Sequence, residues 1–193
     1  MLGKVQNKWN LKNNGIDVNS IDAIFITHEH LDHVQGLKVF AKKYKIKVYA
    51  SLGTIKALEH KGILSDGIDY AVINESGISV NNICIKPFRT SHDCAEGFGY
   101  IVHTPDERSV AVATDLGYMS DEARLLISKC DVVVIESNHD INMLQCGEYP
   151  YYLKRRILSN EGHLSNEACA SELPDLVKSG VSRFVLAHLS KEN

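Results

Sequence analysis

The chain has 193 residues, of which 44% are hydrophobic and 23% are charged, and this ordinary composition leads us to expect a single domain over residues 1–193. A net charge of −3 gives no overall basic field, so any contact with nucleic acid must depend on a local patch or on bound metal. No apolar run approaches the roughly 20 residues of a membrane span, and the first residues lack a secretory core, so we expect a cytoplasmic protein with no membrane association.

The first predicted elements form a βαβ unit. Residues 4–14 are polar and predict a helix that ends at Gly15, and residues 21–26 predict a strand buried on both faces. Apolar residues between positions 34 and 44 recur at helical spacing, and residues 46–50 alternate as a strand. A strand, a helix and a second strand in this order are typical of an α/β fold.

The rest of the chain continues the alternation of strands and helices. A turn sequence at 105–108 between two alternating segments predicts a hairpin, and Pro174 should break or kink the last helix. We expect helices over 54–61, 120–129, 152–159 and 166–178, and strands over 78–89 (one or two, around Asn81 and Asn82), 98–104, 109–114, 131–135 and 182–186.

The densest group of metal-binding side chains directly follows the first predicted strand and contains His28, His30, Asp32 and His33. His28 and His30 project the same way from an extended segment, whereas the next two lie on a turn, so the arrangement fits two adjacent metal ions better than one. Imidazole and carboxylate suit Zn, Mn or Fe, and the five scattered cysteines form no Cys-x-x-Cys pair. A polar loop with chance histidines is the alternative.

Further ligand types fall at the ends of later predicted strands. His92, Asp115, Glu136 and His188 each lie at or just past the carboxyl end of a strand. Ligands in open α/β sheets gather at this edge, because loops there aim side chains inward from a rigid base. The pattern therefore predicts one site built from several strands.

The sequence His-x-His-x-Asp-His after a hydrophobic strand resembles the signature of the metallo-β-lactamase superfamily. The longer run Thr-His-Glu-His-Leu-Asp-His-Val-Gln-Gly-Leu resembles its YycJ/WalJ-type branch. The resemblance implies an α/β fold, the metallo-β-lactamase αββα sandwich, lacking here its N-terminal strands and its C-terminal end. It also implies two divalent metal ions, one held by His28, His30 and His92, the other by Asp32, His33 and His188, with Asp115 bridging.

A second pair of residues resembles the tRNA 3′-processing endonucleases of the superfamily. Glu136 and His163 match their Glu and Gly-His-Ser-Thr motifs, in which the histidine protonates the leaving oxygen and the glutamate orients it. Asp32, His163 and Glu136 are therefore the candidate catalytic residues. His163 as a simple helix-start residue is the alternative. His139 is left open as a substrate contact.

The resemblance implies a dinuclear metal-dependent hydrolase, a phosphodiesterase or exonuclease acting on DNA or RNA. Aspartate at position 115, where two-zinc β-lactamases carry cysteine, points away from lactam substrates. A small-molecule hydrolase (thioesterase, lactonase or cyclic-nucleotide phosphodiesterase) or an inactive metal-binding domain is the alternative. The basic runs at 42–47 and 154–156 are candidate phosphate contacts or solvated faces. Self-association is expected, because missing strands would expose sheet edges.

Overall fold

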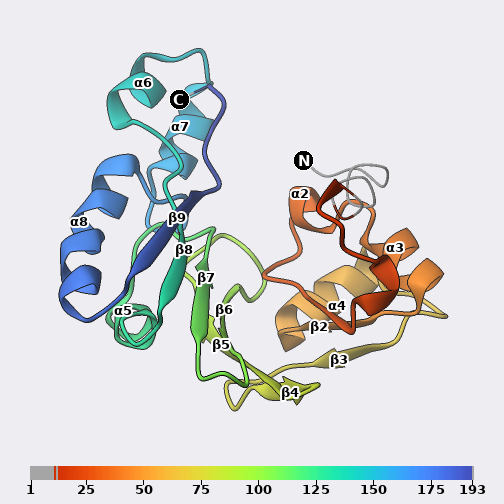
Figure 1. The fold of residues 1–193 in the computed structure, drawn as a ribbon. Helices are drawn as coiled ribbons and strands as arrows, with labels where there is room; N and C mark the ends of the chain where they lie inside the picture. Colours follow the sequence, from red (N-terminus) through yellow and green to blue (C-terminus); the bar gives the residue numbers. More distant parts are fainter. Residues whose placement is uncertain (1–10, 12, 193) are drawn as a thin grey trace. The chain divides into compact units, whose positions relative to one another are not determined.

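The computed structural model describes residues 11 and 13–192, and the chain divides into two compact units (Figure 1). The first unit comprises the chain up to residue 81 with residues 94–98, and the second comprises residues 82–93 and 99–193. The helix predicted over 4–14 lies almost wholly outside the described residues. Gly15, at its predicted end, has φ +69°, the left-handed conformation that a glycine after a helix takes.

The first unit contains a parallel sheet with the strand order β1-β2-β3. Its elements are the 3₁₀ helix η1 (Val18–Ser20), β1 (Ala23–Phe25), α2 (Leu31–Val34), α3 (Leu37–Tyr44), β2 (Lys47–Ala50), α4 (Leu52–His60), β3 (Tyr70–Val72) and β4 (Ile78–Val80). The predicted βαβ unit is confirmed, since β1 pairs in parallel with β2. Strand β3, which is only three residues long, was not predicted.

Two predictions for the first unit are wrong in detail. The first strand was expected to be buried on both faces, but all three residues of β1 are only partly buried, because β1 is the outer strand of its sheet. The helix expected between positions 34 and 44 is two helices, α2 and α3. Gly36 separates them with φ +92°, a conformation that interrupts a right-handed helix.

The helices of the first unit cover its sheet through their apolar faces. Leu37 and Ala41 of α3 and Leu58 of α4 belong to one buried cluster with Val48 and Ala50 of β2. Ser51 caps α4, because its side chain accepts a hydrogen bond from the amide of Thr54. This packing fixes the strand ends from which the histidine-rich segment leaves.

The second unit contains the strands β5-β6-β7-β8-β9 in that spatial order. Its elements are β5 (Ile83–Arg89), β6 (Phe98–His103), β7 (Ser109–Ala113), α5 (Asp121–Ile127), β8 (Val132–Glu136), α6 (Ile141–Cys146), α7 (Tyr151–Ile157), α8 (Asn166–Lys178) and β9 (Arg183–Ala187). The hairpin of β6 and β7 is antiparallel, as predicted, whereas β7, β8 and β9 run parallel to one another. The carboxyl ends of these last three strands therefore lie at one edge of the sheet.

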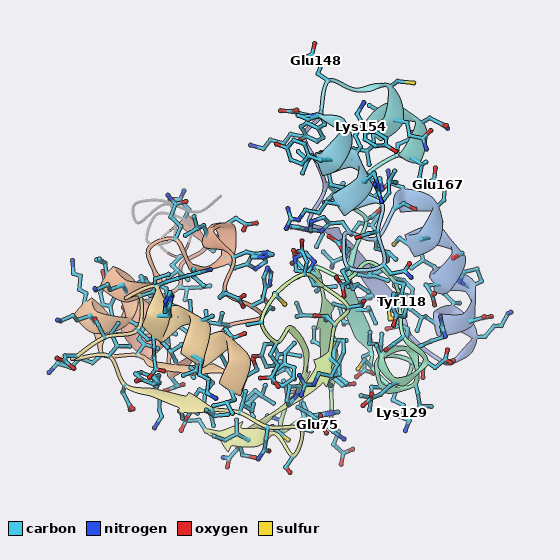
Figure 2. The ribbon with its side chains drawn as sticks, turned by 180° about the vertical axis from the view of Figure 1, so that it is seen from behind. Glu75, Tyr118, Lys129, Glu148, Lys154 and Glu167 are labelled. Carbon is cyan, nitrogen blue, oxygen red and sulfur yellow. The ribbon has the colours of Figure 1, made fainter. Side chains whose placement is uncertain are left out.

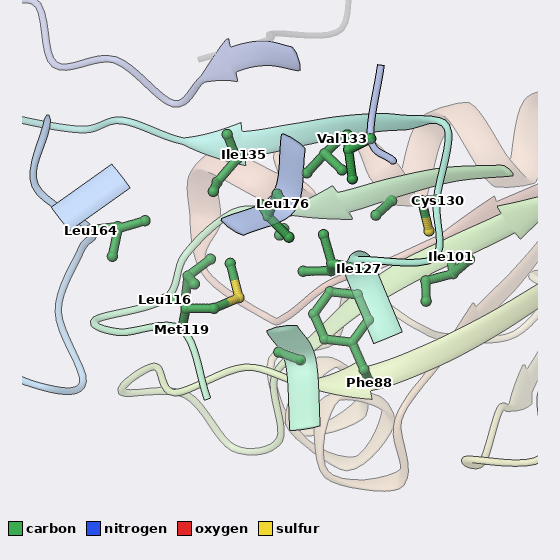
Figure 3. Packing of buried hydrophobic residues seen from close by; sticks show 14 of the residues in the cluster. Phe88, Ile101, Leu116, Met119, Ile127, Cys130, Val133, Ile135, Leu164 and Leu176 are labelled. Atoms are coloured by element: carbon green, nitrogen blue, oxygen red, sulfur yellow. The ribbon is translucent and has the colours of Figure 1, made fainter. Parts of the chain in front are cut away.

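The core of the second unit forms between the sheet and helices α5 and α8 (Figure 3). Val133 and Ile135 of β8 are fully buried, and Ile127 of α5 and Leu176 of α8 belong to the same cluster. The alternating burial of β7 shows that its two faces differ, with the buried face turned to this core. A packed core of this kind holds the strand ends rigidly.

Two helices of the second unit differ from expectation. Helix α6 was not predicted, although Asp140 caps it by accepting a hydrogen bond from the amide of Met143. A break or a kink was predicted at Pro174, and the break is wrong, because helix α8 runs unbroken through this residue. Pro174 and Ala170, whose carbonyl the proline cannot bond, are both exposed, and water can satisfy that carbonyl. Within the described residues no helix combines the length and apolar character needed to cross a bilayer.

Candidate metal centre

Three of the predicted site residues lie at the shared edge of β7, β8 and β9. Glu136 is the last residue of β8, Asp115 follows β7, and His188 directly follows β9. Asp115 and His188 have φ values of +58° and +56°, in the left-handed region that residues other than glycine rarely adopt. Strained conformations of this kind cluster at functional sites, where they aim a side chain.

Glu136 is the centre of the hydrogen bonds at this edge. Its Oε1 accepts a hydrogen bond from His163 Nδ1 at 2.9 Å and another from His188 Nδ1 at 2.6 Å. Its Oε2 accepts from the backbone amides of Leu116 and Leu164 at 3.0 and 3.1 Å. The carboxylate is fully buried, and these four donors occupy both of its oxygens, so Glu136 acts as an acceptor that positions histidines.

The contacts of Glu136 fix which nitrogen of each histidine faces outward. Because an ionised carboxylate only accepts hydrogen bonds, Nδ1 of both His163 and His188 must carry a proton. His188 Nε2 is then left as a lone-pair donor and lies 3.6 Å from Asp115 Oδ1. His163 Nε2 is likewise left free of the contact with Glu136, since that contact is made by Nδ1.

His92 is oriented in the same way by a backbone carbonyl. Its Nδ1 donates to the carbonyl oxygen of Gly162 at 3.0 Å, and its Nε2 lies 3.9 Å from Asp115 Oδ1. Gly162 must be glycine, since a Cβ there would lie 2.1 Å from the carbonyl oxygen of Ile157. The sequence signal for this contact was present in the Gly-His pair, but we assigned the glycine no role.

The surroundings of this group favour a neutral His92 and an ionised Glu136. Burial alone would raise the pKa of Glu136, but the hydrogen bonds from His163 and His188 outweigh it and hold the pKa below its ordinary value. Burial lowers the pKa of His92, against the opposing charge of Asp115. A neutral imidazole is the form that binds metal.

We call the set His92, Asp115, Glu136, His163 and His188 the strand-edge cluster. Ligand atoms of its last four members lie within 4.8 Å of one another. The ring centroid of His163 lies 5.0 Å from that of His92 and 5.1 Å from that of His188. The structure therefore brings together all the site residues predicted within the second unit.

The first unit holds residues 27–33, which we call the histidine loop. The ring of the buried His28 lies 4.5 Å from the ring of His30 and 4.1 Å from that of His33, measured between centroids. Thr27 Oγ1 contacts Nδ1 of His28 at 3.1 Å and Nδ1 of His33 at 3.2 Å. One hydroxyl thus orients two imidazoles. This role of Thr27 was not predicted, although the residue stands directly before the motif.

Other contacts hold the histidine loop in place. Glu29 is buried, and its Oε1 accepts a hydrogen bond from the amide of Ala95 at 2.9 Å. Its carbonyl oxygen accepts from Lys61 Nζ at 3.0 Å. Asp32 is more exposed and lies beside His33, with Oδ2 3.5 Å from Nε2. The loop is therefore anchored at Glu29, while Asp32 and His33 lie nearer the surface.

Three further histidines have no place in either group. His60 and His103 are exposed. His139, left open as a substrate contact, is almost fully buried, and burial lowers its pKa, with the nearby charge of His163 acting in the same direction. A side chain buried to this degree cannot meet a substrate without a rearrangement, so the structure does not support a contact role.

The donor atoms of each group fit a divalent metal. In the strand-edge cluster two imidazole Nε2 atoms face the same carboxylate oxygen of Asp115. In the histidine loop three imidazoles and the Asp32 carboxylate lie within seven residues. Nitrogen and carboxylate oxygen donors of this kind suit Zn, Mn or Fe. These histidine and aspartate groups indicate divalent metal binding.

Comparison with known sequences places the chain in a family. Residues 3–189 match the sequence model of the Beta-lactamase superfamily domain. The chain belongs to this superfamily. It is 40% identical over 180 residues to exodeoxyribonuclease YycJ of Bacillus anthracis, which covers 92% of this chain and 67% of that protein. It is 39% identical over 177 residues to exodeoxyribonuclease WalJ of Streptococcus pneumoniae, with 90% and 65% covered.

The chain therefore spans about two thirds of the length of these curated relatives. The predicted superfamily and its YycJ/WalJ-type branch are confirmed. Among solved structures, a diphosphatase from the PhnP family has a TM-score of 0.72 at 18% identity, covering 96% of this chain and 66% of that one. The metallo-β-lactamase fold protein YhfI from Bacillus subtilis has a TM-score of 0.72 at 15% identity, covering 99% and 73%. These likenesses confirm the predicted fold.

Proposed function

We propose that the chain is a metal-dependent phosphodiesterase that acts as an exonuclease on nucleic acid. The observation that carries the proposal is the double hydrogen bond of Glu136 to His163 and His188. The buried carboxylate of Glu136 positions both His163, the candidate proton donor, and His188, a candidate metal ligand. Proton transfer and metal binding therefore both depend on Glu136. Two relatives named exodeoxyribonucleases support the substrate class and favour DNA over RNA.

We propose that two divalent ions are held by the seven residues that the superfamily resemblance assigns. Within the first unit these are His28, His30, Asp32 and His33, and within the second they are His92, Asp115 and His188. The contacts of Thr27, Gly162 and Glu136 with ligand Nδ1 atoms support the proposal, because such partners fix the tautomer of metal-binding histidines. Bound ions of this kind supply Lewis acidity and lower the pKa of water toward about 7.

The chain's own residues account for the proton that the reaction needs. Hydrolysis forms a bond between a water oxygen and phosphorus, breaks the bond from phosphorus to the leaving oxygen, and requires a proton on that oxygen. His163 Nε2 gives this proton, since Nδ1 is committed to Glu136. Glu136 keeps the ring oriented through its hydrogen bond with Nδ1. Asp32 completes the candidate catalytic set as a ligand.

The test is hydrolysis by the full chain after reconstitution with Zn²⁺ or Mn²⁺. Single-stranded and double-stranded oligonucleotides labelled at either end are compared with a panel of thioesters, lactones and cyclic nucleotides. Stepwise loss of nucleotides from one end supports the proposal. Hydrolysis restricted to the small esters would replace it by a small-molecule hydrolase, and metal binding with no hydrolysis of any substrate would leave an inactive metal-binding domain.

Two expectations about the whole protein stay predictions. A cytoplasmic location is one. Self-association is the other, and it is supported by β9, the outer strand of its sheet, where Val185 and Leu186 are about half exposed. Sedimentation velocity over a range of concentrations tests it, and a monomer at every concentration would contradict it.

A further inference from the structure

Helix α7 (Tyr151–Ile157) has one buried side and one exposed side of unusual composition. Tyr151 and Tyr152 are 76% and 74% exposed, whereas Ile157 is buried. At 100° per residue, Tyr151, Arg155 and Tyr152 follow one another around the exposed side. We call these three residues the α7 face. The α7 face thus presents two exposed aromatic rings and one guanidinium group side by side.

The three basic side chains of α7, which belong to Lys154, Arg155 and Arg156, make different contacts. Lys154 Nζ donates to the carbonyl oxygens of Gln145 and Gly147 at 2.8 and 2.6 Å, so it fastens α7 to the end of α6. Arg156 donates through Nε and Nη2 to both carboxylate oxygens of Asp93, with the Nη2 contact at 2.9 Å. Figure 2 shows Lys154 on the part of the second unit that α6 and α7 form.

Arg155 faces outward instead. Its guanidinium carbon lies 6.0 Å from the centroid of the Tyr151 ring, within the range of a cation–π contact. Among the residues that the structure describes, it forms no ion pair with a carboxylate. Of the three cations of α7, Arg155 is therefore the one whose charge is available to a ligand, and it lies beside the exposed ring of Tyr151.

The α7 face is tied to the strand-edge cluster by short links. The amide of His163 donates to the carbonyl oxygen of Ile157, the last residue of α7, at 3.0 Å. Arg156 binds Asp93, which directly follows His92. A ligand held on the α7 face is thus held at a defined place relative to the candidate acid and one candidate metal ligand, all within the second unit.

We propose that the α7 face is a stacking platform for the bases of a single-stranded nucleic acid, an inference that rests on the proposed function. Exposed aromatic rings bind bases through their flat faces, and only an unpaired strand offers those faces. Arg155 supplies the positive charge that the phosphates need and that the net charge of −3 does not provide. The platform selects a single-stranded end and holds it for cleavage.

The experiment measures binding of a fluorescent single-stranded phosphorothioate oligonucleotide, which resists hydrolysis, to the metal-loaded full chain. Y151A/Y152A is expected to lower the affinity at least about tenfold, whereas Y151F/Y152F, which keeps both rings, binds as the wild type does. Arg155→Ala should weaken binding and reduce the slope of log affinity against log salt by about 0.7, the value for one phosphate contact on a single strand. A blunt duplex should bind more weakly than the single strand.

Matched controls come from the same unit. The first control is Arg108→Ala, in the turn between β6 and β7, where the side chain of Arg108 is 71% exposed. The second is Leu125→Ala on α5, where Leu125 is 60% exposed. Neither should change the affinity. Equal binding by Y151A/Y152A and the wild type, or an equal loss in Arg108→Ala, would overturn the platform. So would a Y151A/Y152A variant that loses self-association but not oligonucleotide binding, since the face would then join two copies.

The outcome separates the platform from the proposed function. If the wild type cleaves single strands and Y151A/Y152A binds and cleaves them equally well, the proposed function stands and the platform is wrong. If the wild type binds the strand through both tyrosines and cleaves no nucleic acid, the platform stands and the nuclease assignment is wrong. Cleavage with a raised KM and an unchanged kcat in Y151A/Y152A supports both.

Discussion

The histidine loop and the strand-edge cluster present the same donor types but are built in different ways. The loop takes its ligands from seven consecutive residues and orients two of them through the neutral hydroxyl of Thr27. The cluster collects its members between positions 92 and 188 and orients two of them through the buried charge of Glu136. A local motif thus brings its ligands together through the chain itself, whereas ligands from distant strands are oriented by a buried carboxylate and by left-handed backbone at Asp115 and His188.

The largest effect should come from removing the metal, because both groups would lose their function at once. Dialysis against a chelator is expected to abolish hydrolysis, and Zn²⁺ or Mn²⁺ should restore it. Elemental analysis of the restored protein should give nearly two ions per chain. The unfolding temperature should fall on chelation, because part of the metal-binding free energy stabilises the fold.

Single ligands test whether both groups take part. His28→Ala in the loop and His188→Ala in the cluster should each reduce the metal content, whereas His60→Ala, an exposed histidine of the first unit, should not. Full metal content in either ligand variant would show that the corresponding group lies outside the site.

The next largest effect is expected from the proton donor of the cluster. His163→Ala should lower turnover of an oligonucleotide by roughly 10²–10⁴-fold, the usual range for a lost general acid, while the metal content stays the same. A nitrophenyl phosphodiester should largely escape the defect, because its leaving group needs no proton. The control is His103→Ala, an exposed histidine on β6. Equal losses on both substrates would mean that His163 positions the substrate or supports the fold.

The charge of Glu136 should have an intermediate effect that depends on pH. Glu136→Gln is expected to lower turnover about 10–100-fold, because it weakens the orientation of His163 and His188 without removing either one. The pKa of Glu136 is depressed in the folded state, so its ionisation stabilises the fold above the ordinary glutamate pKa of about 4.3, and this contribution is lost as the pH falls through the folded value.

Acid unfolding measures that contribution. The free energy of unfolding of the wild type should decrease below about pH 4.3, and the decrease over this window should be smaller in Glu136→Gln. The same pH dependence in both proteins would show that the carboxylate is not ionised as proposed.

The parts of the fold and site that follow local patterns could be predicted from the sequence. The strands ending at Asp115, Glu136 and His188 are short apolar runs, and the ligand types directly after them marked the edge. What could not be predicted depends on contacts between distant residues. The bond of Glu136 to His188 joins positions 52 residues apart, and no periodicity reports it. The interruption at Gly36 was missed because the apolar spacing continues across it.

The smallest effect should come from Thr27, and it bears most directly on the difference between the two groups. Thr27→Val keeps the branched shape but removes the hydroxyl that contacts His28 and His33, so the metal affinity should fall about tenfold, the lower end for a partner of ligand histidines. Thr27→Ser keeps the hydroxyl and should retain the affinity. Competition with a chromophoric chelator measures both variants. Because a hydroxyl carries no charge in this range, the defect should not change between pH 5 and 8, unlike one that arises from a titrating carboxylate or imidazole. An affinity unchanged in Thr27→Val would show that packing alone orients the histidine loop.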